Sequence, residues 1–544
     1  MVKTIKWLAG VTAVAATVTL LAGCTDTKEA TPKKEAAATP SAQSNPRTGG
    51  LSLPLSSTPV TYKFLIREVA DIPVKNDWLV LKELAKKTNV NIQFEPVPST
   101  GYEEKKKLLI ATNNVPDFSL VNETDALKAG PDKVFLNLKP YIDKGLMPNV
   151  KKLMSEIPDI AAVTTAGDGG IYSLPGLSEP NWLSYSWMVR EDIMKELGLQ
   201  APKNTDDLYR ILKAMKEKYP KSFPLITQNA AAAGANVPSL FNVFTTMFTE
   251  TTSALGYNPF NKKYEFAPNH PQYKSMLTYL NKLYTEGLLD QEFAIMKTQN
   301  WEQRVQSGTS FMTYYNKGRI DIFTDAAVKA DPNAKYNMVG MTPVAAPGMR
   351  PFQLIKAKVN APVSVALSAN IKNPEVAVQF FDYLYSDEGS DIYMLGAEGV
   401  TYEKVNGKAQ YLPAFGTIPT AIQSKLKTEY GVRYNNFPLL NYVNKGRDAE
   451  PPMTKKLQEL EAMNAKSALD PSPSVVATEA ELSLEKSKLP SLEKYIEQKL
   501  TEFVMGKTAI TDAALTDFIA QCKKLGSDDL IKMYNEQLQR ALKK

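Results

Sequence analysis

The chain has 544 residues, of which 43% are hydrophobic and 22% are charged, a composition typical of a globular protein with room for two sizeable lobes. Its formal net charge is +6, and without the leader lysines Lys3 and Lys6 the balance is 62 basic against 58 acidic residues. So small a surplus, spread over so long a chain, excludes the electrostatic footprint of a nucleic-acid-binding protein.

Two residue types are nearly absent, and their scarcity excludes several kinds of site. The only cysteines, Cys24 and Cys522, lie at opposite ends of the chain, which excludes a structural disulfide framework. The only histidine, His270, stands between two prolines in "APNHPQY", so a multi-histidine metal site is excluded and a Ser/His/Asp triad would depend on one loop residue. We therefore expect no catalytic residues, no metal and no cofactor.

The first 24 residues, "MVKTIKWLAGVTAVAATVTLLAGC", have the order of a secretory signal peptide: two lysines, an apolar run and small residues before a cleavage point. A retained membrane anchor is the alternative, but the run is short for a ~20-residue span and no positive charge follows directly. Residues 25–58 lack a hydrophobic period and are rich in Thr, Lys, Ala, Pro and Ser, which predicts a flexible linker.

The folded part is predicted to open with alternating strands and helices. Strands are expected at 60–66, 90–97 and 117–121, and helices from about Asn76 and at 102–112, with Asn76 or Asp77 capping the first helix. This order predicts a parallel, doubly wound sheet, in which ligands bind beyond the carboxyl ends of the strands. The turns 67–75, 97–102 and 122–127 are therefore candidate ligand edges.

Farther along, "SWMVR" predicts a strand, and two amphipathic helices follow, the second capped by Thr205. A helix is expected in "HPQYKSMLTYLNKLYTEGLLD", strands in "SFMTYYN" and "VNAPVSVALSAN", and a helix pair in "NPEVAVQFFDYLYSDEGSDIYMLG". The last hundred residues are predicted to be mostly helical, with Cys522 as a buried packing thiol.

Several of these segments, in this order, carry a family resemblance. "LKELAKKTNVNIQFEPVPSTGYEEKKKLLIATNNVPDF" is similar to the opening βαβ unit of extracellular solute-binding lipoproteins of ABC importers, in the large, maltose-binding-like family 1 class that takes up oligosaccharides. "TAGDGGIYSLP", "WMVREDIMKELGLQAPKNTDDLYRILKAMK", "QSGTSFMT" and "NPEVAVQFFDYLYSDEG" are similar to later phrases of the same family. The surface turns Asn89-Val90 and Ala111 to Asn114 depart from the family pattern.

The resemblance implies a fold and a chain organisation. The fold is α/β, of the type II periplasmic-binding-protein class: two α/β lobes joined by a hinge, with a helical C-terminal part. The implied domains are a signal peptide at 1–23, a lipidated N-terminus and linker at 24–58, lobe 1 at 59–175 plus 362–420, and lobe 2 at 176–361 plus 421–544. "KEKYPKSFPL" lacks the calcium loop that some alginate-binding relatives carry, so we expect no calcium there.

The resemblance also implies partners and a location. "LAGC" resembles the lipobox of bacterial lipoproteins, which implies a lipid on Cys24 and a protein held on the extracellular face of the cytoplasmic membrane. We expect a monomer that closes on an oligosaccharide or glycan fragment between its lobes and then docks on ABC permease subunits. No nucleic acid is expected as a partner.

A sugar offers C–H faces to aromatic rings and hydroxyls to planar polar groups, and the stretch "GLSEPNWLSYSWMVR" is dense in both. For most candidates, and above all for the aromatic residues of strands, packing in the core or a structural ion pair is the alternative. The expected ligand-binding residues are Trp182, Tyr185, Trp187, Arg190, Trp301, Tyr314, Tyr315, Asn316, Trp78 and Asp125.

Two other functions stay open at this point. A binder of peptides or other non-sugar solutes could use the same scaffold, because fold does not fix ligand class. A secreted polysaccharide-degrading enzyme would need a pair of carboxylates, which 58 acidic residues could supply, although no nucleophile motif such as G-x-S-x-G is present. Resemblance along nearly the whole chain favours binding without catalysis.

Overall fold

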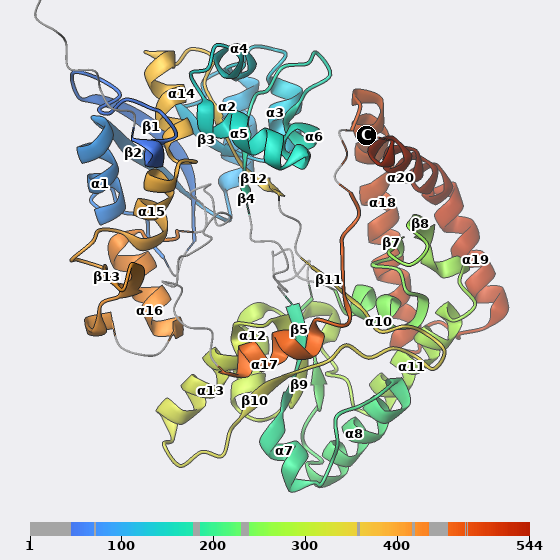
Figure 1. Ribbon diagram of the computed structural model, residues 1–544. Helices are drawn as coiled ribbons and strands as arrows, with labels where there is room; N and C mark the ends of the chain where they lie inside the picture. Colours follow the sequence, from blue (N-terminus) through green and yellow to red (C-terminus); the bar gives the residue numbers. More distant parts are fainter. Residues whose placement is uncertain are drawn as a thin grey trace, which may run out of the picture. The chain divides into compact units, whose positions relative to one another are not determined.

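The protein is described here by a computed structural model that covers residues 45–69, 72–177, 185–229, 239–355, 359–415, 419–434, 455–473, 475 and 477–543. The predicted lipid attachment point, Cys24, lies outside these residues. Two main sheets, each with its own helices and hydrophobic core, organise the chain (Figure 1). Among the helices of these ranges, none has the length and apolar character needed to cross a bilayer.

The first sheet has five strands in the order β2-β1-β3-β12-β4. They are β1 (Val60–Glu68), β2 (Val90–Pro98), β3 (Phe118–Val121), β4 (Leu174–Leu177) and β12 (Val359–Leu367). The first three run parallel, as the βαβαβ pattern predicts, whereas β12 pairs antiparallel with both β3 and β4. Strand β12, which begins more than 180 residues after β4 ends, lies between β3 and β4, so the sheet is mixed.

The first helix begins three residues later than the sequence predicts. Helix α1 spans Leu79–Thr88, and Trp78, at its N-cap, makes no side-chain capping bond. Asn76 bonds instead to the neighbouring strand: its Oδ1 accepts from Phe94 N at 2.6 Å and its Nδ2 donates to Phe94 O at 3.3 Å. The predicted cap at Asn76 is wrong because its side chain bonds to the backbone of β2 and not to the first turn of the helix.

Several helices accompany the first sheet: α2 (Tyr102–Ala111), α3 (Glu123–Ala129), α4 (Lys139–Asp143), α5 (Pro148–Glu156), α6 (Pro158–Thr164), α14 (Pro374–Tyr383), α15 (Asp387–Leu395) and α16 (Pro419–Lys425). Asp382 of α14 holds the start of α5, because its carboxylate accepts from Asn149 N at 3.2 Å and Val150 N at 2.8 Å. Leu426 and Tyr434 belong to the same buried core, which therefore continues past residue 420.

The second sheet has the order β10-β5-β9-β6. Strand β5 (Tyr185–Arg190) lies between β10 (Met338–Met341) and β9 (Met312–Asn316) and is antiparallel to both, and β6 (Leu225–Ile226) pairs parallel with β9. The accompanying helices are α7 (Glu191–Glu196), α8 (Thr205–Lys218), α10 (Leu240–Thr249), α11 (Tyr273–Thr285), α12 (Thr298–Gln306), α13 (Arg319–Ala330) and α17 (Lys455–Asn464). Asn204, not the predicted Thr205, caps α8, since its Oδ1 accepts from Asp206 N and Asp207 N.

Three two-stranded ribbons complete the strands: β7 (Leu255–Asn258) with β8 (Lys263–Phe266), β13 (Tyr402–Val405) with β14 (Lys408–Tyr411), and β11 (Gln353–Leu354) with β15 (Ala468–Leu469). The last is parallel and joins segments more than 100 residues apart in sequence.

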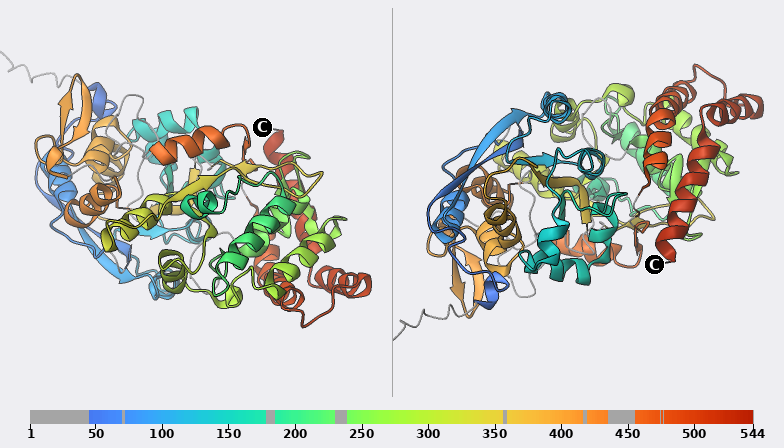
Figure 2. Two further views of the ribbon diagram at one scale, coloured as in Figure 1. Left: turned by 90° about the horizontal axis from the view of Figure 1, so that it is seen from below. Right: turned by 90° about the horizontal axis from the view of Figure 1, so that it is seen from above.

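The C-terminal helices α18 (Glu479–Val504), α19 (Asp512–Lys524) and α20 (Ser527–Leu542) confirm the predicted helical end of the chain. Figure 2 shows them beside the second sheet's helices, where α18 contacts α11 and α20 contacts β8. Cys522 is fully buried in this core, near Phe518 and Tyr273, as predicted for a packing thiol.

Candidate functional site

An aromatic wall stands on neighbouring strands of the second sheet. Tyr185 and Trp187 are two residues apart on β5, so their side chains lie on the same face of the sheet. The antiparallel register places Tyr314 of β9 directly opposite Trp187. The rings of Tyr185 and Tyr314 are stacked with centroids 6.4 Å apart, and Trp187 meets Tyr314 edge-on at 5.4 Å. Burial raises the pKa of Tyr185 and of Tyr314, so both keep their phenolic protons at neutral pH.

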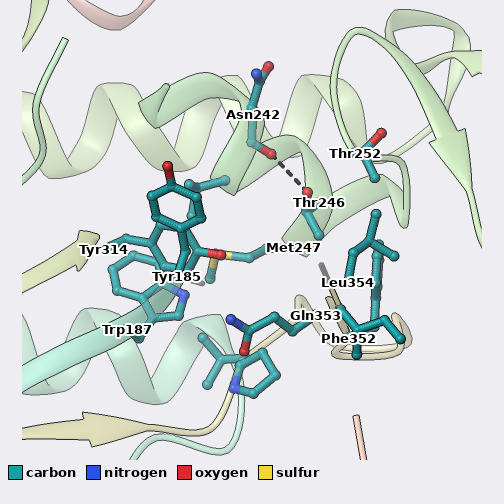
Figure 3. A pocket seen from close by; sticks show the side chains of 14 residues that line it. Tyr185, Trp187, Asn242, Thr246, Met247, Thr252, Tyr314, Phe352, Gln353 and Leu354 are labelled. Atoms are coloured by element: carbon teal, nitrogen blue, oxygen red, sulfur yellow. Dashed lines mark hydrogen bonds between the residues drawn. The ribbon is translucent and has the colours of Figure 1, made fainter. Parts of the chain in front are cut away.

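A second wall comes from helix α10. Asn242, Val243, Thr246 and Met247 lie at helical spacing on one face of this helix and line the same pocket as the aromatic rings (Figure 3). The Thr246 hydroxyl donates to the Asn242 carbonyl at 2.9 Å. Val243 and Met247 are thus the apolar part of this wall, and Asn242 and Thr246 are its polar part.

The third wall is the segment Phe352 to Ile355, which includes strand β11. Gln353 N donates to Ser467 O and Ile355 N to Leu469 O, both at 2.9 Å, so pairing with the β15 segment fixes this backbone. Gln353 is only 8% exposed, yet its Nε2 has no hydrogen-bond partner among the residues that the structure describes. A buried donor without a partner is costly, and a ligand oxygen would relieve that cost.

Together these walls enclose a cavity of about 360 Å³, within the size range of small-molecule sites, which is roughly 300–1,000 Å³. Figure 3 shows the amide end of Gln353 directed toward the Trp187 side of the pocket. The remaining lining residues are Thr252, Pro343 and Val344. Aromatic faces opposite an unpartnered amide suit the C–H face and the hydroxyls of a sugar ring.

Of the ten predicted binding residues, the structure brings three to this pocket, Tyr185, Trp187 and Tyr314. Trp182 and its neighbours at 178–184 lie outside the described residues. Trp187 is only 2% exposed and contacts Phe244 edge-on at 6.1 Å, so most of its ring packs in the core while one side lines the pocket.

Three predicted aromatic residues are not among those that line the pocket, and two of them, Trp301 and Trp78, are corrected to packing positions. Trp301 is fully buried, and its Nε1 donates to Thr313 Oγ1 at 2.9 Å. Tyr315 follows Tyr314 on β9 and is half-buried; its ring meets the Trp301 ring at 4.6 Å and the Tyr185 ring edge-on at 6.1 Å, so it lies beside the pocket without lining it. Trp78 is 2% exposed, and its Nε1 donates to Thr428 O at 3.2 Å in the first core.

The predicted polar positions are also engaged within the protein. Arg190 donates from Nε to Asp192 Oδ1 at 2.8 Å and lies 3.8 Å over the Tyr336 ring, so it is a structural ion pair. Asn316 Oδ1 accepts from Gly318 N at 2.9 Å beyond the end of β9. Asp125 forms an ion pair with the buried Lys106 at 2.6 Å, so its carboxylate neutralises a charge inside the protein.

Sequence reasoning missed Gln353, Phe352, Asn242 and Thr246. The stretch "PFQLI" pairs an aromatic residue with an amide, which is a usable signal, but its place in the pocket depends on pairing with β15 far along the chain. Within the described ranges, no group of three or more His, Cys, Asp or Glu side chains is placed to hold a metal ion. The expectation of no calcium at 216–225 stays a prediction.

Comparison with known proteins adds an independent finding. Residues 77–391 match the family described as bacterial extracellular solute-binding protein. The fructooligosaccharide ABC transporter substrate-binding protein FusA of Streptococcus pneumoniae serotype 4 is 25% identical over 412 residues, 70% of this chain and 72% of that protein. Lipoprotein LipO of Bacillus subtilis is 22% identical over 469 residues, 84% of this chain and 88% of that protein.

The fold has solved counterparts as well. The crystal structure of the alginate-binding protein AlgQ2 without calcium ion superimposes with a TM-score of 0.73 at 22% identity, over 89% of this chain and 99% of that one. The likeness confirms the type II, two-lobed α/β fold that the sequence predicts.

Proposed function

This chain belongs to the family of bacterial extracellular solute-binding proteins, and we propose that it captures an oligosaccharide in the pocket lined by Tyr185, Tyr314 and Gln353 and delivers it to an ABC permease. The observation that carries the proposal is the pocket itself: stacked rings on one side and, on the other, a buried amide donor that has no partner among the described residues. The similarity to a fructooligosaccharide-binding relative supports the ligand class.

The mechanism proposed is reversible binding without chemistry. The aromatic rings supply flat apolar area at low entropic cost, and Gln353 Nε2 donates a hydrogen bond to a ligand oxygen. The first core includes Leu51 and Tyr434, so we place lobe 1 on residues 51–177 and 359–434 instead of 59–175 and 362–420, and lobe 2 on the core that contains the pocket. Closure of the lobes on ligand is the motion expected for this fold.

We further propose that the chain is a lipid-anchored monomer. The lipobox-like sequence ending at Cys24 and the similarity to a lipoprotein of Bacillus subtilis support this. Cys24→Ser should move the protein from the membrane fraction of expressing bacteria to the medium without changing its ligand affinity. Retention of this variant in the membrane would contradict lipid attachment at Cys24.

Isothermal titration with neutral and acidic oligosaccharides and with peptides, on the purified full chain, tests the function. We expect one oligosaccharide to bind per chain. The bound ligand should raise the free energy of unfolding by ~RT ln(1 + [L]/Kd). Tyr185→Ala should weaken binding by about tenfold or more, since a lost aromatic platform costs on the order of 1–2 kcal/mol.

Tyr141→Ala is the matched control, because Tyr141 is a half-buried tyrosine that packs against the other core. It should lower stability and leave the affinity unchanged. Binding of peptides alone would refute the oligosaccharide proposal, and shortened glycans in the recovered ligand would favour the enzyme alternative.

A further inference from the structure

We infer that the pocket accepts an uncharged sugar unit and rejects uronic acids, an inference that rests on the proposed function. Its basis is the chemistry of the walls. The fourteen described residues that line the cavity are aromatic, aliphatic, hydroxyl or amide side chains, and none of them carries a charge at neutral pH. A carboxylate placed there would meet no cation of the lining.

The arginines of this part of the chain are already committed. All five arginines between residues 185 and 355 form ion pairs with carboxylates of the protein. The pairs are Arg190 with Asp192, Arg210 with Asp207, Arg304 with Asp290 and Glu292, Arg319 with Glu302, and Arg350 with Glu250. Arginine is the side chain best suited to bidentate hydrogen bonding with a carboxylate. Each arginine in this range already binds a carboxylate of the protein, so none is available to bind a uronate.

Arg350 comes two residues before the third wall, and its engagement is the most informative. It donates from Nε and Nη2 to the two carboxylate oxygens of Glu250, at 2.9 and 2.6 Å. Its guanidinium also lies 3.6 Å over the Phe260 ring, which contacts Phe352 edge-on at 5.4 Å. Turning the Arg350 side chain into the pocket would break a bidentate pair and an aromatic contact, and would leave Glu250, only 8% exposed, with the Arg350 N–H as its remaining bond to this residue.

The groups that do face the pocket favour neutral hydroxyls. Gln353 Nε2 is a neutral donor that suits a hydroxyl or ring oxygen. Tyr185 and Tyr314 remain protonated, because burial raises their pKa, and they present polarisable ring faces to C–H groups. An unpaired carboxylate buried against these rings should lower affinity by ~100-fold or more relative to the neutral sugar.

The test uses matched trisaccharides that differ only in oxidation at C6. Titration calorimetry on the full chain compares α-1,4-galactotriose with α-1,4-trigalacturonate, and β-1,4-mannotriose with the β-1,4-mannuronate trimer, with kestose and maltotriose as further neutral probes. We expect a neutral trisaccharide to bind at least ~100-fold more tightly than any uronate. Its Kd should change by less than about twofold between 50 and 300 mM NaCl, because no ion pair contributes.

Each outcome decides the inference. A uronate that binds as tightly as its neutral counterpart, or a strongly salt-dependent Kd, overturns the inference and leaves the oligosaccharide proposal standing. Binding of peptides but of no saccharide overturns both. Lys356 and Lys358 lie outside the described residues, and a Lys356→Ala/Lys358→Ala chain should keep the neutral preference unchanged.

Two substitutions, one of a pocket glutamine and one of a surface glutamine, test the effect of a negative charge in the pocket lining. Gln353→Glu replaces the unpartnered donor by a carboxylate and should weaken a neutral ligand by about tenfold or more. Gln303→Glu makes the same change on the exposed face of α12 and should leave Kd unchanged. Thermal unfolding of both variants establishes that they fold, and equal ligand affinities in the two would contradict the assignment of Gln353.

Discussion

Trp301 offers the sharpest test of whether an aromatic residue serves packing or ligand binding. Its ring is fully buried between Tyr315 and Phe323, and its Nε1 donates to Thr313, which is also fully buried. Trp301→Phe would keep much of the ring but leave the Thr313 hydroxyl unpaired, at a cost of ~1–3 kcal/mol in unfolding free energy. Trp301→Ala would cost about 3–5 kcal/mol.

The hydrogen bond itself can be measured with a double-mutant cycle. Thr313→Val alone strands the indole N–H, whereas Trp301→Phe with Thr313→Val removes both partners. The double variant should therefore be less destabilised than the sum of the singles by ~1–2 kcal/mol. Urea unfolding followed by far-UV circular dichroism gives the free energies, and calorimetry gives the ligand affinity of each folded variant.

Two results would refute this reasoning. A coupling energy of zero would show that the Trp301–Thr313 bond is absent. Loss of ligand affinity in Trp301→Phe without loss of stability would restore Trp301 as a ligand platform, as the sequence alone suggested.

Three further predictions concern other parts of the chain. Glu481 accepts from Thr478 N at 2.7 Å and pairs with Arg540, and although burial opposes the shift, these bonds lower its pKa from 4.5 to about 2. Its stabilisation is therefore present above pH ~5 and lost as the pH falls toward 2, and Glu481→Gln should flatten that part of an acid-unfolding curve while costing about 1 kcal/mol at pH 7. Burial raises the pKa of Cys522 to about 12, so in a Cys24→Ser chain no thiol should react with a disulfide reagent at pH 8 until denaturant is added; rapid reaction of the folded chain would contradict its burial. Arg190→Lys should destabilise the protein by about 1–2 kcal/mol in urea unfolding without changing ligand affinity, because lysine reproduces neither the two-pronged bond to Asp192 nor the contact with Tyr336; an altered Kd would return Arg190 to the ligand site.

The local pattern of the sequence predicted the elements well and their ends less well. Alternation in 60–66 and the apolar face of α1 are short-range signals, and both elements form, although α1 begins three residues later than expected. The caps failed at Asn76 and Thr205 because a nearby competing partner, the Phe94 backbone or the neighbouring Asn204, decides which side chain bonds the helix. Such competition depends on distances that residue order does not fix.

The residues of the candidate binding site also differ in whether local sequence pattern predicts them. Tyr185, Trp187 and Tyr314 could be predicted because strand alternation and adjacent strands bring them together. Tyr315, one residue away, contacts both Trp301 and Tyr185 but does not line the pocket, and residue order alone does not separate it from Tyr314. Gln353 could not be found, because it reaches the pocket only through the pairing of β11 with β15.

The central claim is that this chain binds an oligosaccharide reversibly at the Tyr185–Gln353 pocket and does not alter it. Equilibrium dialysis of the full chain with a bound neutral oligosaccharide, followed by mass spectrometry of the released sugar, tests this directly. We expect one intact sugar per chain, with binding strongly reduced in Tyr185→Ala and Gln353→Glu and preserved in Gln303→Glu. Shortened sugar, or full binding by the two pocket variants, would contradict it.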